Sequence, residues 1–247
     1  MAPTNLAAID AQWRDVQRFD SKFLLKLDDV QQFINEHCGN LEVLEIDSLQ
    51  SFRYVTEYYD TPAYHLYRDH YMRRRRRIKV RIRHYLDSDV SQCEVKARHG
   101  NSQTRKFILP ECHSLNFSAR EFITGTLATM NLAERLTSSI DELTHVATTT
   151  FDRITLNRSD SNEKITIDLN LSVSAGQRSL STSNDMALVE IKSMTKRTRT
   201  RSDFARFGMR PVGFSKYAAA IDLLVSHRYR VNSRRTLQHA FGFTSLR

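Results

Sequence analysis

The stretch from Arg77 to Arg98 restricts the fold most strongly, because two faces of opposite chemistry alternate along it. One face of its first half is entirely cationic and consists of Arg77, Lys79, Arg81 and Arg83. The other face of the same half is apolar and consists of Ile78, Val80 and Ile82. A turn follows, and the second half places Glu94 and Lys96 opposite Val95. This period of two predicts a β-hairpin with one apolar and one charged face.

The charged face of this hairpin needs a compensating partner. Like charges directly across a strand pair repel each other, so a face dominated by lysine and arginine is destabilising on its own. A bound polyanion would offset that repulsion. The hairpin therefore indicates a protein that holds an acidic ligand.

Composition is compatible with several acidic ligands. The chain has 247 residues and a formal net charge of +9, which favours nucleic acid, a membrane surface or phosphates without choosing among them. The three cysteines, Cys38, Cys93 and Cys112, are odd in number and lack metal-type spacing, which predicts a reducing compartment. No apolar run approaches the roughly 18 residues of a membrane span. We expect a cytoplasmic protein, and the sequence is also compatible with association with a membrane-bound partner.

Six further strands and six helices complete the predicted elements. Besides the two strands of the hairpin, strands are predicted over residues 16–27, 49–60, 102–109, 144–157, 164–171 and 187–194. Helices are predicted over residues 28–38, 62–72, 118–130, 131–143, 198–207 and 214–227, with Asp28 and Asn131 as N-caps. Residues 1–13 are interpreted as a loose or weakly helical leader, and the basic segment 229–247 as a tail. A single domain over residues 14–228 is expected.

Two arrangements fit these strands, most of which carry one apolar and one charged face. In the first, an open antiparallel sheet turns its charged face to bulk water. In the second, an α+β fold closes eight antiparallel strands into a barrel, helices cover the apolar outside, and the charges line a wet interior. Amphipathic helices need an apolar surface to cover, and the outside of such a barrel provides one.

The closed arrangement would have to hold water or a polyanion, because unpaired cations in a dry interior cost several kcal/mol each. Phosphate chains suit it, since arginine binds phosphate oxygens in a bidentate fork. Carboxylates among these cations would need a divalent metal to face a phosphate. Candidates for binding Mg²⁺ or Mn²⁺ are Glu190, Glu94, Asp20 and Asp168. For each of them, a salt bridge to a neighbouring lysine or arginine is an equally good interpretation.

Eight short motifs give the chain a family resemblance. They are SKFLL at 21–25, YYDTPAYHLYRD at 58–69, KVRIRHY at 79–85, CEVKAR at 93–98, FDR at 151–153, ITIDL at 165–169, VEIKS at 189–193 and FSKY at 214–217. In order and spacing, the chain from Gln17 to Leu224 resembles the VTC domain, the polyphosphate polymerase module of the triphosphate tunnel metalloenzyme superfamily. The resemblance implies an antiparallel tunnel of eight strands lined with basic residues.

The resemblance also implies roles for individual residues. The residues expected to bind the phosphate chain and act in catalysis are Lys22, Arg81, Arg83, Lys96, Lys106, Arg153, Lys164 and Lys216. The nucleotide is expected to bind Arg81, Arg83, Lys96 and Lys192, and the metal to bind Glu190 and Glu94. Three positions depart from the family pattern: Lys164 replaces an arginine, Asp20 stands where glutamate is common, and Gly213 lies where a second lysine is expected.

The activity implied by the resemblance is phosphoryl transfer from ATP to a growing inorganic polyphosphate chain, with Mn²⁺ or Mg²⁺ as cofactor. Such a transfer requires positioning and charge neutralisation, and no catalytic base, since a terminal phosphate is already anionic. Two alternatives stay open: a tripolyphosphatase or nucleoside triphosphatase with water as acceptor, and a non-catalytic polyphosphate-binding module. No specific nucleic acid is expected, and the run Arg73–Arg76 is interpreted as a solvated basic turn.

Overall fold

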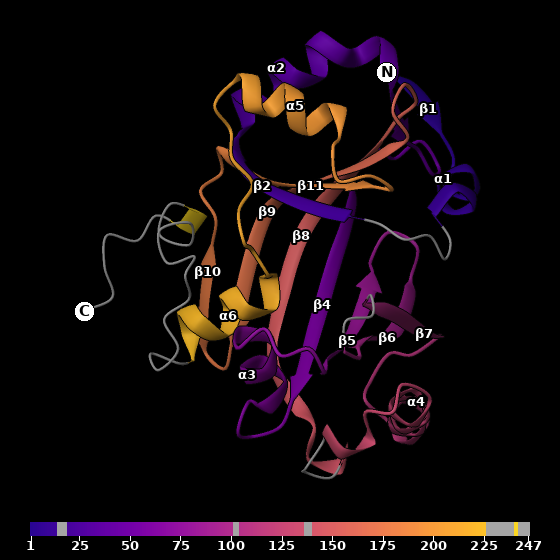
Figure 1. Cartoon of the computed structure of the whole chain (residues 1–247), viewed down its shortest axis with the longest axis vertical. Coiled ribbons are helices and arrows are strands. Elements are labelled where there is room, and N and C mark those ends of the chain that lie inside the picture. Colours follow the sequence, from indigo (N-terminus) through magenta and orange to yellow (C-terminus); the bar gives the residue numbers. More distant parts are fainter. Residues whose placement is uncertain (14–18, 101–103, 136–139, 226–239, 242–247) are drawn as a thin grey trace.

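The computed structural model describes residues 1–13, 19–100, 104–135, 140–225 and 240–241 (Figure 1). Its strands are β1 (Ala2–Thr4), β2 (Phe19–Lys26), β3 (Leu41–Leu44), β4 (Phe52–Asp60), β5 (Arg77–Tyr85), β6 (Val90–Arg98), β7 (Arg105–Pro110), β8 (Thr144–Arg158), β9 (Glu163–Ala175), β10 (Arg178–Ser181) and β11 (Met186–Ser193). Its α-helices are α1 (Leu6–Trp13), α2 (Leu27–His37), α3 (His65–Tyr71), α4 (Phe117–Thr129), α5 (Arg199–Arg206) and α6 (Lys216–Leu224). Short 3-10 turns occur at Cys38–Asn40, Ala133–Arg135 and Ile140–Glu142.

The eight predicted strands are all present and form one continuous path. Their order is β2-β11-β9-β8-β4-β5-β6-β7, and every pairing along the path is antiparallel. The short strands β3 and β10 pair with β8 and β9, and β1 adds to β3 in parallel. The chain therefore has the predicted α+β class, built on a large and mainly antiparallel sheet.

The sheet is curved. Register shifts interrupt β4 between Tyr58 and Tyr59 and β8 between Thr150 and Asp152, and such bulges bend a strand and increase its twist. In Figure 1, β2 and β11 run at a steep angle to β8 and β4. Within the described residues, β2 and β7 at the ends of the path do not pair with each other. The predicted hydrogen-bonded closure of the barrel is thus absent from this part of the chain.

Helices cover the outer face of the sheet because that face is apolar. Phe33 of α2 and Phe204 of α5 pack with Phe23 of β2 and with buried aliphatic residues of β8, β9 and β11. On the other half, Ile123 and Leu127 of α4 pack on the apolar faces of β5 and β6. The charged faces of the same strands therefore point to the inside of the curve, as in the second of the two arrangements that the alternation allowed.

A third core lies on the inner face at one end. The helices α3 and α6 contribute Tyr67 and Tyr217, which pack with Tyr58 and Phe151 of the sheet. Burial of these aromatic rings fixes both helices over the end of the interior. Figure 1 shows α3 and α6 at the end of the molecule opposite to α2 and α5.

Several local predictions are corrected by the structure. The leader contains the helix α1, which agrees with its weakly helical interpretation, and also the short strand β1, which was not predicted. Helix α2 begins at Leu27, so Asp28 lies in its first turn and is not its cap. The predicted helix 131–143 is replaced, in the described residues, by two 3-10 turns, and Asn131 has a left-handed φ of 50°. Of the predicted tail, only Ala240 and Phe241 lie within the described residues, and both are buried. No described helix has the length and hydrophobicity needed to cross a bilayer.

Candidate functional site

Charged side chains from seven strands share the inner face of the sheet. Strand register shows this directly, because cross-strand partners lie on the same side of a sheet. The inner-face pairs are Lys22 with Glu190, Lys192 with Lys164, Arg153 with Asp168, Arg81 with Glu94, Lys79 with Lys96, and Lys96 with Lys106. Every cationic strand residue predicted for the site therefore faces the interior.

Glu94 is surrounded by cations on β5–β7. Its carboxylate is fully buried and accepts hydrogen bonds from Arg81 Nε at 2.5 Å, Gln92 Nε2 at 2.9 Å and Lys106 Nζ at 3.5 Å. Burial alone would raise the pKa of Glu94, but Arg81, Arg83 and the neighbouring lysines hold it well below its usual range. Glu94 is an ionised carboxylate with both oxygens engaged by the protein.

A second ion-pair group joins the sheet to α6. Arg153 donates to both oxygens of Asp168, from Nε at 2.6 Å and from Nη2 at 2.8 Å, and Lys216 Nζ contacts the same carboxylate. Burial opposes the charge on Asp168, but the two cations lower its pKa to about 2. Lys216 is brought here by its position at the first residue of α6, after the N-cap Ser215.

Glu190 is held more loosely. Lys22 Nζ lies 3.4 Å from one of its oxygens, and Lys192 Nζ lies 3.7 Å from the other. Despite burial, Lys192, Lys22 and Arg153 keep the pKa of Glu190 well below its usual range, so it is ionised. Of Glu94, Asp168 and Glu190, it is the carboxylate whose protein contacts are longest and easiest to replace by a ligand.

The two ends of the strand path approach each other across the interior. Lys96 on β6 interacts electrostatically with Glu190 and Lys192 on β11, although four strands of the path lie between β6 and β11. Lys79 on β5 likewise interacts with Lys22 on β2. The sheet therefore curls far enough to bring opposite walls within electrostatic range.

Crowding of cations perturbs the interior lysines. Burial first, and then the charges of Arg81 and Lys22, lower the pKa of Lys79 to about 7. Burial likewise lowers the pKa of Lys216 to about 8, although Asp168 opposes the shift. The Arg81 charge, together with burial, lowers the pKa of Lys96 well below its usual value. Without a bound anion, some of these interior lysines therefore lose their protons at alkaline pH.

An aromatic ring positions two of the arginines. The guanidinium of Arg83 lies 5.5 Å from the centre of the Tyr54 ring, and that of Arg153 lies 5.2 Å from it. Arg83 Nε also donates to Thr56 Oγ1 at 3.2 Å. Sequence reasoning missed Tyr54 and Thr56, because these two uncharged side chains carry no chemical signal that would single them out.

Lys79 and His70 also belong to the site. Lys79 Nζ donates to Ser215 Oγ at 3.2 Å and lies 5.6 Å from the centre of the Tyr217 ring, so it joins β5 to α6. The Lys79 charge and burial lower the pKa of His70 to about 2, which keeps this α3 imidazole neutral. The alternation of β5 could have identified Lys79, whereas nothing in the sequence pairs His70 with it.

The donor set fits a hard divalent cation that takes most of its ligands from a substrate. Within the described residues, no three histidine, cysteine or acidic side chains gather at one point. Glu190 supplies one ionised carboxylate, and its cross-strand neighbour Thr166 has a buried Oγ1 without a hydrogen-bond partner among the described residues. Mg²⁺ is commonly bound in this way, through one or two carboxylates plus phosphates and water.

Comparisons with known proteins agree with this geometry. The profile of the VTC-domain family matches residues 17–225. No curated protein matches the sequence.

Two solved structures share the fold at low sequence identity. A protein from Bacillus halodurans described as a "putative adenylate cyclase" has a TM-score of 0.54 and 13% identity, over 85% of this chain and 98% of that chain. A Hippeastrum protein described as a "putative adenylyl cyclase" with a dominant triphosphatase activity has a TM-score of 0.50 and 13% identity, also over 85% of this chain and 98% of that chain.

Proposed function

The chain belongs to the VTC-domain family, and on that premise we propose that it is a metal-dependent polyphosphate polymerase. It would transfer the γ-phosphate of ATP to the end of an inorganic polyphosphate chain held along the basic interior. The observation that carries the proposal is the convergence of cations from opposite walls, such as Lys96 and Lys22, around one polar space. We also propose that a bound phosphate chain draws the two ends of the sheet into the closed tunnel.

The arginines would perform most of the binding. Arg81, Arg83 and Arg153 are held in place by Glu94, Thr56 and Asp168, so their guanidinium groups are oriented before a ligand arrives. Preoriented cations stabilise the charge that spreads over the phosphoryl oxygens, without reorganisation at the moment of transfer. Lys22, Lys96, Lys106, Lys164 and Lys192 would add charge along the chain.

Positioning is the second contribution of this site. Phosphoryl transfer requires the attacking and leaving oxygens to lie in line with the transferred phosphorus. Lys216 comes from α6 while its partners come from β8 and β9, so groups from two layers can hold neighbouring phosphates at a fixed separation. Because the attacking terminal phosphate is already anionic, no side chain has to remove a proton.

The metal site of the proposal is Glu190, with Thr166 beside it. A bound Mg²⁺ or Mn²⁺ would supply positive charge that neutralises the phosphate oxygens. Glu94 was predicted as a second ligand, but its oxygens already accept from Arg81, Gln92 and Lys106. We therefore assign Glu94 the role of orienting Arg81.

Hydrolysis is the second candidate, and one observation favours it. The α3 and α6 helices cover one end of the inner face, with Tyr217 stacked on Tyr58 at a centroid separation of 4.9 Å. An interior blocked at one end suits a triphosphatase, in which water accepts the phosphoryl group, better than a growing chain. The dominant triphosphatase activity ascribed to the Hippeastrum protein of similar fold is consistent with this alternative.

One experiment separates the candidates. The purified chain is incubated with ATP and Mn²⁺, and the products are analysed by gel for long polyphosphate and by colorimetry for free phosphate. Long chains are the expected result, and they would support the polymerase. Free phosphate alone would replace that proposal by the triphosphatase. Neither product, together with retained binding of tripolyphosphate, would identify a non-catalytic binding module.

A further inference from the structure

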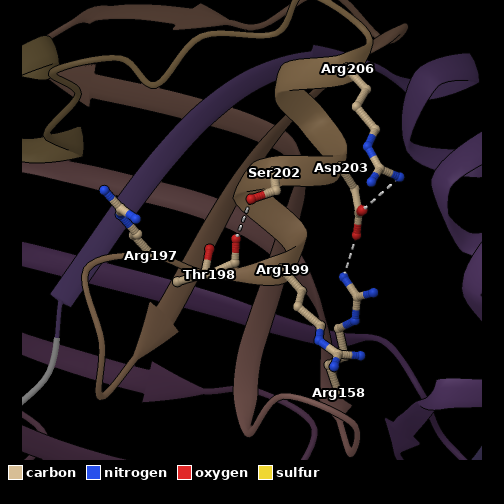
Figure 2. A pocket seen from close by; sticks show the side chains of 7 residues that line it. All are labelled: Arg158, Arg197, Thr198, Arg199, Ser202, Asp203 and Arg206. Carbon is tan, nitrogen blue, oxygen red and sulfur yellow. Dashed lines mark hydrogen bonds and ion pairs between the residues drawn. The ribbon is translucent and has the colours of Figure 1, made fainter.

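A second basic cavity lies on the outer side of the sheet, beside α5 (Figure 2). Its volume is about 450 Å³, within the range of small-ligand sites. The lining residues are mainly basic, and they are Arg158, Arg197, Thr198, Arg199, Ser202, Asp203 and Arg206. None of the residues that the interior site uses is among them. The cavity therefore needs a separate explanation.

The simplest explanation is structural, and Arg158 partly supports it. Its side chain is only 4% exposed and donates to Asp203 at 2.5 Å, to Thr200 Oγ1 at 3.0 Å and to Asp160 at 2.9 Å. These contacts fasten α5 to the end of β8. Nε and Nη1 of the guanidinium make these contacts.

The other arginines exceed what the carboxylates can neutralise. Arg199 Nη1 lies 3.0 Å from a carboxylate oxygen of Asp160, which also pairs with Arg158. Arg206 Nη1 lies 3.8 Å from a carboxylate oxygen of Asp203, which also pairs with Arg158. Three arginines thus share two carboxylates. Figure 2 shows the side chains of Arg158, Arg199 and Arg206 reaching the same side of α5. An anion at this point would receive charge-assisted hydrogen bonds from all three.

The helix end itself is not the binding element. The backbone N–H groups of Arg199 and Thr200 donate to Glu163 at 2.6 and 3.0 Å, and that of Arg201 donates to Thr198 Oγ1. Because these first-turn donors are already satisfied, recognition must come from the guanidinium groups. Guanidinium forks select oxyanions with several acceptor oxygens, above all phosphates.

We propose that this cavity is a second anion site, which binds the phosphoryl groups of a short inorganic phosphate chain. Nucleic acid is disfavoured, because no aromatic side chain lines the cavity to stack a base. The identity of the ligand rests on the proposed function, since a polyphosphate-handling protein meets this anion. The site is also connected to the interior through the backbone. Strand β11 carries Lys192 of the interior, and the segment that follows β11 leads directly into α5.

The test is calorimetric titration of the full chain with sodium tripolyphosphate in metal-free buffer. Each wild-type chain is expected to bind two equivalents of tripolyphosphate, one in the interior and one in this cavity. The Arg199→Ala/Arg206→Ala variant removes two arginines that are 63% and 80% exposed, and should lose one equivalent or weaken it by at least about 10-fold. The matched control is Arg73→Ala/Arg75→Ala, which removes the same charge from exposed positions just after α3 and should keep both.

Two further variants keep the result interpretable. Ser202→Asp introduces a carboxylate into the lining without removing an arginine, and should weaken the same equivalent. Arg83→Ala should weaken the interior equivalent only. Retention of both equivalents in Arg199→Ala/Arg206→Ala and in Ser202→Asp would overturn the second site while leaving the interior proposal intact. If Arg83→Ala kept both equivalents, the result would contradict the proposed function and not the second site. Tighter binding of a single-stranded oligonucleotide than of tripolyphosphate at this cavity would also overturn the inference.

Discussion

The interior carboxylates Asp168 and Glu190 differ in how tightly protein cations hold them. Asp168 receives two donors from Arg153 at 2.6 and 2.8 Å and also contacts Lys216. Among the described residues, Glu190 is paired with two lysines, whose Nζ atoms lie 3.4 and 3.7 Å from its carboxylate oxygens. A carboxylate with short, multiple contacts serves to orient cations, whereas one with long contacts can exchange them for a metal. This difference assigns the two residues distinct roles.

Removing the charge of Asp168 should therefore destabilise the fold. In Asp168→Asn, Arg153 and Lys216 lose their shared counter-ion in a buried setting, which costs about 3–5 kcal/mol of unfolding free energy. Urea denaturation measures this loss. The Asp152→Asn control removes an aspartate from the same strand pair that faces outward, against an Arg53 side chain that is 59% exposed, and should cost less than about 1 kcal/mol.

The same pair of variants gives a pH test. Because the folded-state pKa of Asp168 is lowered to about 2, its contribution is complete above the unfolded pKa of about 4 and is lost as pH falls through 2. The free energy of unfolding of Asp168→Asn should be lower than that of wild type at pH 4, and this deficit should shrink as the pH falls from 4 to 2. An equal deficit at both pH values would contradict the assignment.

Glu190→Gln should separate catalysis from binding. The amide keeps the size of the side chain but removes the negative charge that the metal requires, so turnover of ATP should fall by about 100-fold or more. Binding of tripolyphosphate in metal-free buffer should be retained or tightened, because a like charge has been removed from the interior. Glu57→Gln, on the outer face of β4, is the control and should change neither quantity. Unchanged turnover in Glu190→Gln would remove Glu190 from the proposed metal site.

Single residues also show where sequence reasoning ends. The alternation of β5 and β6 was sufficient to place Arg81, Glu94 and Lys96 on one face, because a strand has a fixed period of two. Nothing in that pattern could show that Glu94 is committed to Arg81, since the partner of a carboxylate depends on side-chain geometry. Tyr54 was missed for a related reason: its ring acts on Arg83 and Arg153 only after three strands come together.

At the level of elements, α6 closes one end of the interior and presents Lys216 to it. Its N-cap, Ser215, has two roles, because its hydroxyl accepts from Ala218 N–H and from Lys79 Nζ at 3.2 Å. The first contact stabilises the helix, and the second connects the helix to the opposite wall. Loss of the hydroxyl should thus affect both stability and the site.

Ser215→Ala should lower the unfolding free energy by about 1 kcal/mol through loss of the cap. It should also reduce kcat/KM for ATP by about 5- to 10-fold, which corresponds to about 1 kcal/mol of transition-state stabilisation. Asn116→Ala is the matched control, since Asn116 caps α4 by accepting from Ala119 N–H at 3.0 Å on the outside of the sheet. It should show the same loss of stability with kcat/KM within about twofold of wild type. Equal kinetic effects in both variants would show that the α6 cap acts through stability alone.

The elements themselves were largely predictable. All eight strands with clear alternation were found, whereas β1, β3 and β10, of three or four residues each, are too short to show a period. The helix predicted over residues 131–143 had Asn131 as its expected N-cap, but the described part of this segment forms 3-10 turns. There, Leu132 and Leu143 are buried beneath α4 in the same core, so packing overrides local propensity.

At the scale of the whole molecule, the curvature of the sheet decides the function and was the least predictable feature. The same alternation is compatible with a flat sheet exposed to water. The two bulged strands and the helices on the outside settle the direction in which the charged face curves. As a result, lysines that are far apart along the strand path repel one another across a common space.

That repulsion predicts proton uptake when a polyanion binds. In the free protein, burial and neighbouring cations lower the pKa of Lys79 to about 7 and that of Lys216 to about 8, so both are partly neutral at pH 8. A bound phosphate chain opposes these effects and raises both pKa values towards the ordinary lysine value. Binding of tripolyphosphate should therefore take up protons at pH 8, and its affinity should fall as pH rises from 7 to 9. Metal-free calorimetry in two buffers of different ionisation enthalpy measures this uptake.

The ligand titrates in the same range, so the informative quantity is a difference between variants. Lys79→Met removes one lysine of lowered pKa and keeps an apolar chain of similar length beside the Tyr217 ring. Wild type should take up more protons than Lys79→Met at pH 8, and the two should converge at pH 6, where Lys79 is already charged before binding. Equal uptake by both proteins at pH 8 would mean that Lys79 does not sense the bound chain, and that the phosphates lie elsewhere than between β5 and α6.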